Sequence, residues 1–219
     1  MSDAGLRRLC KELKKIDANP IPNVVIKPLD GNFYRWVFLL HNLPHPDYKD
    51  GLYLGRIDFP TTYPQTPPDV VFITQSGRFE NDKKICLSFT SYHPETWSPA
   101  WTIETMMMGM ISFMLSEEQS TGTIQVSSYT RRQIAQDSKS KVLAWSGFTN
   151  HFLGDLKKIG IDLQKLEAVL SSPKPPPSQS NKFFQLLGNL TGIHDQQHLL
   201  LITVFLLLVI VLLISAILT

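Results

Sequence analysis

The feature that most constrains this chain is a continuous apolar run close to its end. The run extends from Leu199 to Leu218 and contains no charged residue. A helix of that length, at ~1.5 Å per residue, spans the ~30 Å hydrocarbon core of a bilayer. A helix in a soluble core is seldom apolar on every side. The run therefore predicts a single transmembrane helix. Only Thr219 follows it, so we expect insertion after synthesis, with the preceding residues facing the cytosol.

A change in composition separates this predicted anchor from the rest of the chain. Residues 171–178 have the sequence SSPKPPPS, and such segments are extended and bury little surface. We therefore expect a folded domain over residues 1–171, a Pro/Ser-rich linker and juxtamembrane segment over 172–198, and the anchor over 199–218. Residues 183–190 form either a short interfacial helix or a disordered spacer. Asn189 begins an Asn-Leu-Thr glycosylation pattern that we expect to stay unmodified on the cytosolic side.

Charge and cysteine usage exclude several classes of function. The net charge is only +2 and no long basic run is present, so nothing indicates a nucleic-acid partner. Two cysteines, Cys10 and Cys86, cannot form a disulfide scaffold, and no Cys-x-x-Cys or His/Cys cluster predicts a metal site. The N-terminus lacks the apolar stretch of a secretory signal. These features fit a reducing compartment.

The first third of the chain predicts a helix followed by a sheet. Apolar residues recur at helical spacing from Leu6 to Ile16, with Cys10 on the core side, and Asn19-Pro20 ends this helix. Strand-like runs follow at residues 24–29, 33–42, 52–59 and 70–73. Their short connections predict an antiparallel meander. In the third run one face, with Tyr53, Ile57 and Phe59, is expected to pack on helices.

Helices are expected again after residue 100, which makes the fold class α+β. Thr102 is a suitable N-cap, and Met106, Met107, Met110 and Met114 form a helical stripe. We interpret these methionines as core residues, since flexible apolar side chains fill interiors far more often than they bind ligands. A third helix is predicted over residues 129–152. A fourth is predicted after Asp155 as its cap.

Cys86 is the residue of greatest chemical interest. A cysteine between Ile85 and Leu87 is either a small buried hydrophobe or a nucleophile. Nearby positive charge favours the reactive thiolate, and Lys83 and Lys84 would supply it if they fold beside the sulfur. Polar, Gly-bearing residues precede Cys86 and a Pro- and Trp-rich loop follows it. This setting favours a thiol at the edge of a groove.

Three ordered segments resemble the signature of the ubiquitin-conjugating enzymes. They are YPQTPP at residues 63–68, Cys86, and WSPAWTI at residues 97–103. Three further segments resemble the tail-anchored J-class branch that serves degradation at the endoplasmic reticulum: TQSGRF at 74–79, ICLS at 85–88 and YHPETW at 92–97. Ser76 stands where that branch usually has Asn. The branch also lacks the His-Pro-Asn tripeptide of most relatives.

The resemblance implies a fold, an activity and a set of partners. The fold has an N-terminal helix, a four-stranded antiparallel sheet and C-terminal helices. Cys86 accepts ubiquitin as a thioester from an activating enzyme and passes it, with a membrane ubiquitin ligase, to protein substrates. The enzyme needs no cofactor or metal, because ATP is used by the activating enzyme. The basic face of the first helix is either solvated or docks the activating enzyme and ligases. The implied location is the endoplasmic reticulum membrane.

The resemblance also assigns roles to further residues. Its ligase-binding surface comprises Tyr63, Pro64, Pro67, Pro68, Ser98, Pro99 and Ala100. Ser76, Asn81 and backbone amides near Cys86 are candidate donors to the tetrahedral intermediate. His93 either takes a proton from an attacking hydroxyl or simply hydrogen-bonds its loop. The branch is associated with transfer to serine and threonine as well as to lysine.

Two other classes of protein compete with an enzyme. A membrane-anchored ubiquitin-binding module of the same fold is the first, although such inactive variants lack the cysteine. A tail-anchored tether or fusion factor is the second, but heptads before the anchor are absent. Formation of a thiol-sensitive ubiquitin adduct distinguishes the enzyme from both.

Overall fold

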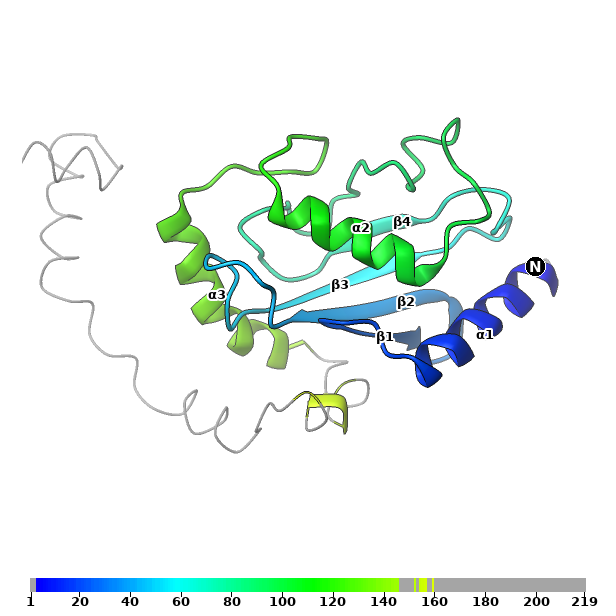
Figure 1. The fold of residues 1–219 in the computed structure, drawn as a ribbon, viewed down its shortest axis with the longest axis horizontal. Coiled ribbons are helices and arrows are strands. Elements are labelled where there is room, and N and C mark those ends of the chain that lie inside the picture. The colour runs from blue at the N-terminus through cyan, green and yellow to red at the C-terminus, as the bar shows by residue number, and fades with distance from the viewer. Residues whose placement is uncertain (1–2, 146–151, 153, 157–158, 160–219) are drawn as a thin grey trace, which may run out of the picture. The chain divides into compact units, whose positions relative to one another are not determined.

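The computed structural model of the chain describes residues 3–145, 152, 154–156 and 159. All of them belong to one compact unit, Met1–Val169. Its elements are α1 (Asp3–Ala18), β1 (Val24–Leu29), β2 (Asn32–His41), β3 (Leu52–Asp58), β4 (Asp69–Phe72), α2 (Ile103–Leu115) and α3 (Ser128–Leu143). Figure 1 shows α2 lying across one face of the sheet, with α1 and α3 toward opposite ends of the strands.

The four strands form an antiparallel sheet in the order β1-β2-β3-β4, which confirms the predicted meander. In the longest ladder, β2 pairs with β3 from Arg35 opposite Asp58 to His41 opposite Leu52. β1 has the predicted bounds, and each end of the other strands lies within one residue of its predicted position. Alternating apolar residues therefore located the strands well.

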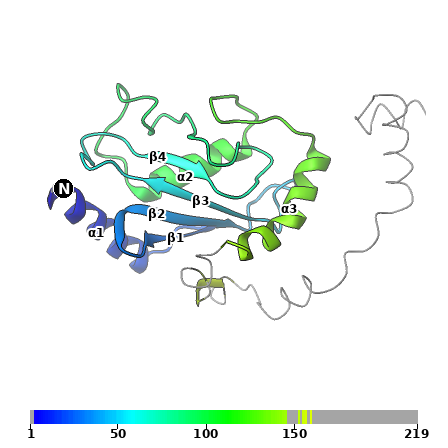
Figure 2. The same cartoon turned by 180° about the vertical axis from the view of Figure 1, so that it is seen from behind.

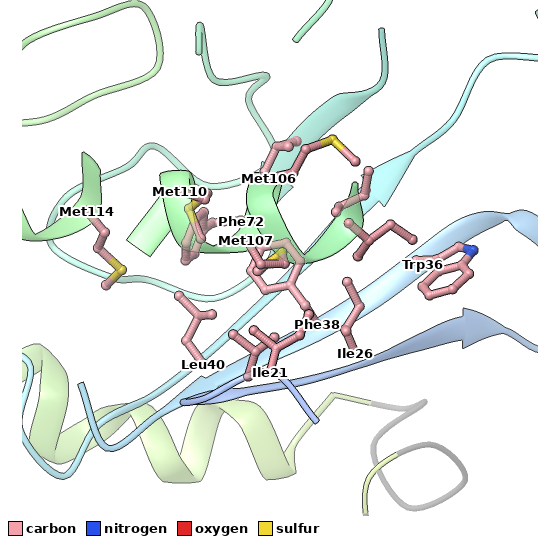
Figure 3. Packing of buried hydrophobic residues seen from close by; sticks show 14 of the residues in the cluster. Ile21, Ile26, Trp36, Phe38, Leu40, Phe72, Met106, Met107, Met110 and Met114 are labelled. Atoms are coloured by element: carbon pink, nitrogen blue, oxygen red, sulfur yellow. The ribbon is translucent and has the colours of Figure 1, made fainter. Parts of the chain in front are cut away.

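The main core lies between the sheet and α2. Met106, Met107, Met110 and Met114 are each at most 1 % exposed, and they belong to the same buried cluster as Phe38 and Phe72 of the sheet (Figure 3). The methionine stripe is thus core, as predicted. Thr102 is the N-cap of α2: its hydroxyl accepts from the Thr105 amide, and the Thr105 hydroxyl accepts from the Thr102 amide. This cap fixes where the preceding loop ends.

A second, smaller core covers the opposite face of the sheet, seen from behind in Figure 2. Val37, Leu39, Leu52 and Leu54 pack there with Val142 of α3 and with Phe152 and Leu156. The expectation that helices cover one face was therefore incomplete. Leu54 alternates with Tyr53, so a strand with apolar residues on both sides predicts two covered faces.

Polar contacts join α1 to the start of α2. Glu12 is only 6 % exposed, and its carboxylate accepts from the Arg8 guanidinium at 2.8 Å and from the Ile103 amide at 3.3 Å. Arg8 also donates to the carbonyls of Pro99 and Trp101 at 3.1 and 3.0 Å. Leu9 and Ile16 are buried as expected, and Cys10 is half-buried. The first helix thereby holds the loop that leads into α2.

The prediction of a third helix over residues 129–152 was wrong at its C-terminal end. α3 ends at Leu143, where the Ala144 amide bonds to Ser140 and the Trp145 amide reaches back only to Val142. Asp155, expected to cap a fourth helix, is itself helical, as are its neighbours Gly154 and Leu156. Its carboxylate pairs with the Lys27 ammonium. No local sequence pattern predicts this contact.

Within the described residues, no helix has the length and apolar character needed to cross a membrane. The predicted anchor at 199–218, the linker, the segment 183–190, the Asn189 pattern and the rest of the predicted fourth helix lie outside those residues.

Candidate active site

Cys86 follows the end of the sheet and is held through its backbone. The Ile85 amide bonds to the Val70 carbonyl at 3.0 Å, which ties the segment to β4. The Cys86 amide donates to the Thr121 carbonyl at 3.0 Å, and the Ser120 hydroxyl donates to the Cys86 carbonyl at 2.8 Å. A loop some 35 residues downstream therefore fixes the position of the cysteine.

The Cys86 side chain is half-buried and lines an open groove of about 510 Å³. The groove lies between the cysteine segment and the end of α2. Its lining residues are Cys86, Leu87, Ser88, Phe89, His93, Thr96, Trp101, Gly109, Ser112, Phe113, Ser116 and Glu118. The thiol thus lies at a groove rather than inside the core, as its flanking residues suggested.

His93 is the side chain in contact with the sulfur. Its Nε2 lies 3.0 Å from the Cys86 Sγ, and its Nδ1 lies 3.0 Å from the Glu95 Oε1. The pKa of the Glu95 carboxyl is lowered, first by its own backbone amide and then by the hydrogen bond with His93. The three side chains form a continuous line of hydrogen-bonding groups from carboxylate to thiol. A thiol beside an imidazole can pass its proton to that ring and become a nucleophile.

Lys83 and Lys84 were expected to supply positive charge to the Cys86 sulfur, but both pair with carboxylates instead. The Lys83 ammonium pairs with Glu80 at 2.7 Å, and the Lys84 ammonium pairs with Asp69 at 2.6 Å. The hydrogen bond with Asp69 raises the pKa of Lys84. Both positive charges are therefore matched by carboxylates, and the partner of the sulfur is His93.

Ser76 and Asn81 are engaged in their own loop. Ser76 is fully buried, and its hydroxyl oxygen accepts from the Arg78 and Phe79 amides at 3.2 and 3.0 Å. The Asn81 amide group donates to the Ile73 carbonyl at 3.2 Å. Neither residue lines the groove at Cys86. Their role as donors to the tetrahedral intermediate stays a prediction.

Arg78 links this loop to the far wall of the groove. Its guanidinium is fully buried and donates to the carbonyls of Phe113 and Glu118. It also lies 4.9 Å from the centroid of the Phe113 ring. Phe113 and Glu118 both line the groove. Arg78 therefore helps to hold the groove wall in place through its contacts with these two residues.

A sequence model of the family described as ubiquitin-conjugating enzyme matches residues 8–145. The chain belongs to the ubiquitin-conjugating enzyme family. It is 35% identical to Ubiquitin-conjugating enzyme E2 6 of Kluyveromyces lactis over 178 residues, which is 80% of this chain and 70% of that protein. It is 36% identical to human Ubiquitin-conjugating enzyme E2 J2 over 78% of this chain and 66% of that protein.

Other alignments with relatives of this family are shorter. The chain covers 55% of the E2 6 protein of Debaryomyces hansenii at 41% identity. Among solved structures, human Ubiquitin-conjugating enzyme E2 G1 matches with a TM-score of 0.47 and 28% identity, over 52% of this chain and 97% of that one.

The surface that the family resemblance assigns to ligases combines two loops. The Trp97 indole donates to the Pro64 carbonyl at 2.9 Å, which joins residues 60–68 to residues 97–101. Residues 61–65 form turns, with a cis Tyr63-Pro64 peptide. The exposed members are Ser98, Pro99 and Ala100, Pro64 is half-buried, and Tyr63, Pro67 and Pro68 are buried. Ligase binding stays a prediction.

Several site residues were missed in the sequence. Glu95 could have been found, since a carboxylate two residues from a histidine is within reach of its ring across a turn. Ser120, Thr121 and Arg78 carry no local signal for their contacts, which join segments far apart in the chain. Only the folded structure brings Ser120 and Thr121 to Cys86, and Arg78 to the residues behind the groove.

Proposed function

We propose that this chain carries ubiquitin as a thioester on Cys86 and transfers it to lysine side chains, and to serine and threonine hydroxyls, of target proteins. The observation that carries the proposal is the half-buried Cys86 thiol in an open groove, 3.0 Å from His93 Nε2. A structural cysteine needs neither the groove nor the imidazole. Membership of the ubiquitin-conjugating family supplies the chemistry.

The first step is transfer from an activating enzyme. Cys86 loses its proton to His93 Nε2, and its sulfur attacks the carbonyl carbon of the ubiquitin thioester. A new carbon–sulfur bond forms at Cys86, and the bond to the cysteine of the activating enzyme breaks. ATP is consumed upstream, so this chain itself requires no cofactor.

In the second step Cys86 is the leaving group. A lysine acceptor must first lose a proton to solvent, because its unperturbed pKa is ~10.4. Glu118 is among the residues that line the groove, and its negative charge favours the approach of an ammonium group. A hydroxyl acceptor needs a base at the moment of attack, and His93 is placed to provide it.

The tetrahedral intermediate needs donors other than the two nearest amides. The Cys86 amide is bonded to Thr121, and the Leu87 amide is bonded to the Thr90 hydroxyl at 3.0 Å. Both hold the segment in place, so a donor to the oxyanion must come from elsewhere in the groove or from a bound partner.

We further infer that the enzyme works at the endoplasmic reticulum membrane in the degradation of proteins there, together with a membrane ligase. The apolar run at 199–218 and the Pro-rich segment before it support an anchored domain on a linker. Similarity to proteins named E2 6 and E2 J2 agrees with the tail-anchored branch that the sequence resembles.

A non-reducing gel tests the catalytic part of this proposal. The chain is incubated with activating enzyme, ATP and ubiquitin, and the expected product is a ubiquitin adduct that disappears on adding thiol. A chain that binds ubiquitin without forming this adduct is an anchored binding module instead. Fractionation and protease protection of the tagged full chain test the location.

A further inference from the structure

The loop from Thr90 to Thr96 presents more than a histidine to Cys86. The His93 amide donates to the Thr90 carbonyl at 2.9 Å, and the Thr96 amide donates to the His93 carbonyl at 3.1 Å. The Thr96 hydroxyl also donates to the Ser88 carbonyl at 3.0 Å. These bonds fold the segment into successive turns, which put the Glu95 carboxylate on the side of the imidazole opposite the sulfur.

We propose that Glu95 is a positioning residue that holds the His93 imidazole in its Nδ1–H form, so that Nε2 faces Cys86 as a proton acceptor. This inference rests on the proposed thioester chemistry and deepens it. Its basis is the pair of 3.0 Å distances, from Glu95 Oε1 to Nδ1 and from Nε2 to the Cys86 sulfur.

The two ring nitrogens compete for one proton in a neutral imidazole. An ionised carboxylate only accepts hydrogen bonds, so the nitrogen beside Glu95 is the one that carries the proton. The lone pair of Nε2 then points at the thiol. When the thiol ionises, its proton moves from Sγ to Nε2, Nδ1 keeps its own proton, and no other bond changes. The Glu95 charge stabilises the resulting imidazolium.

The surrounding charges do not replace Glu95 in this role. Among the described residues that line the groove, the titratable groups are Cys86, His93 and Glu118. Asp69, which the Ser91 hydroxyl of the same loop contacts, is already paired with Lys84. The Glu95 side chain is 63% exposed, so solvent screens its charge and the effect on rate is modest.

Alkylation of Cys86 by iodoacetamide measures this role without ubiquitin. The full chain carries Cys10→Ser, so that Cys86 is its only cysteine, and the rate is followed against pH in Glu95→Ala, Glu95→Gln and His93→Gln. The matched control is Glu80→Ala, which removes an exposed carboxylate paired with Lys83. At pH ~7, which is well below the usual thiol pKa of ~8.5, Glu95→Ala should slow alkylation about two- to fivefold. This is the range of effect expected for an ion pair that is exposed to solvent.

The pH dependence separates positioning from a general loss of structure. At high pH, where the thiol ionises without help, Glu95→Ala should react like the parent. Glu95→Gln should lie between the two, because its side-chain oxygen still accepts from Nδ1–H without a charge. Nitrogen-15 NMR of labelled histidine, at a pH where His93 is neutral, should show the Nδ1–H tautomer of His93 in the parent and a mixture of the Nδ1–H and Nε2–H tautomers in Glu95→Ala.

Two outcomes overturn the inference. In the first, the alkylation rate of Glu95→Ala has the same pH profile as that of Glu80→Ala, while His93→Gln is still alkylated slowly. His93 would then act without help from Glu95. The other is a parent His93 that carries its proton on Nε2. If His93→Gln itself alkylates normally, the role of His93 in the proposed function fails as well.

Discussion

Replacing His93 by Gln should slow transfer to hydroxyls far more than transfer to amines. The acceptor oxygen attacks the carbonyl carbon bonded to the Cys86 sulfur, and His93 Nε2 lies 3.0 Å from that sulfur. The ring nitrogen is therefore within direct reach of the attacking hydroxyl. General-base help is typically worth at least ~10²-fold, which is about 2.7 kcal/mol of barrier. An amine that has already lost its proton needs this help less.

Single-turnover discharge of the preformed thioester measures this difference. Acceptors are Nα-acetylated serine, threonine and lysine, so that only the side chain can react. His93→Gln should reduce the serine and threonine rates by ~10²-fold or more, reduce the lysine rate by a much smaller factor, and leave the extent of Cys86 loading unchanged. His45→Gln, the same change in a loop outside the groove, is the control. Equal slowing with all three acceptors shows that His93 only shapes its loop.

Three further predictions concern the thiol, the anchor and the ion pair between Glu117 and Arg131. Cys86→Ser should abolish the thiol-sensitive adduct or convert it to a more stable oxyester, while Cys10→Ser charges normally; equal loss in both refutes the assignment. Deleting Leu199–Thr219 should leave a chain that stays in solution and still charges, and a deleted chain that fails to fold places the domain boundary elsewhere. Glu117 accepts two hydrogen bonds from the buried Arg131 guanidinium, at 2.5 and 2.9 Å. Its own side chain is 69% exposed, so solvent screens the pair, and Glu117→Gln should lower the free energy of unfolding measured in urea by about 0.5–1 kcal/mol, whereas Glu80→Gln should leave it unchanged. Arg131 lowers the pKa of Glu117, so its contribution should be present at neutral pH and vanish as the pH falls through that lowered value; a Glu117→Gln penalty that persists in acid contradicts it.

Local patterns predicted the elements of this fold with good accuracy. Alternation gave the four strands to within a residue, and the hydroxyl of Thr102 correctly marked the start of α2. Patterns failed where a distant contact decides the outcome. The end of α3 and the placement of Asp155 depend on the second core and on Lys27. The pairing of Lys27 with Asp155 leaves no periodic signal in the sequence.

The site divides in the same way. Cys86 and His93 are seven residues apart, and their neighbours suggested a groove. The loop around Ser120 that holds Cys86 could not be inferred, because its bonds to the cysteine cross more than thirty residues. The predicted role of Lys83 and Lys84 beside the sulfur was wrong, because their closeness to Cys86 in sequence does not reveal that Glu80 and Asp69 pair with them.

Mass spectrometry of the charged protein tests the central claim most directly. The chain is loaded with activating enzyme, ATP and ubiquitin, quenched in acid without thiol, and measured intact and after digestion. The account predicts the addition of one ubiquitin less one water, located on the peptide that contains Cys86 and removed by thiol. Ubiquitin found only on a lysine, or a chain that stays unmodified while a known conjugating enzyme charges in parallel, contradicts it.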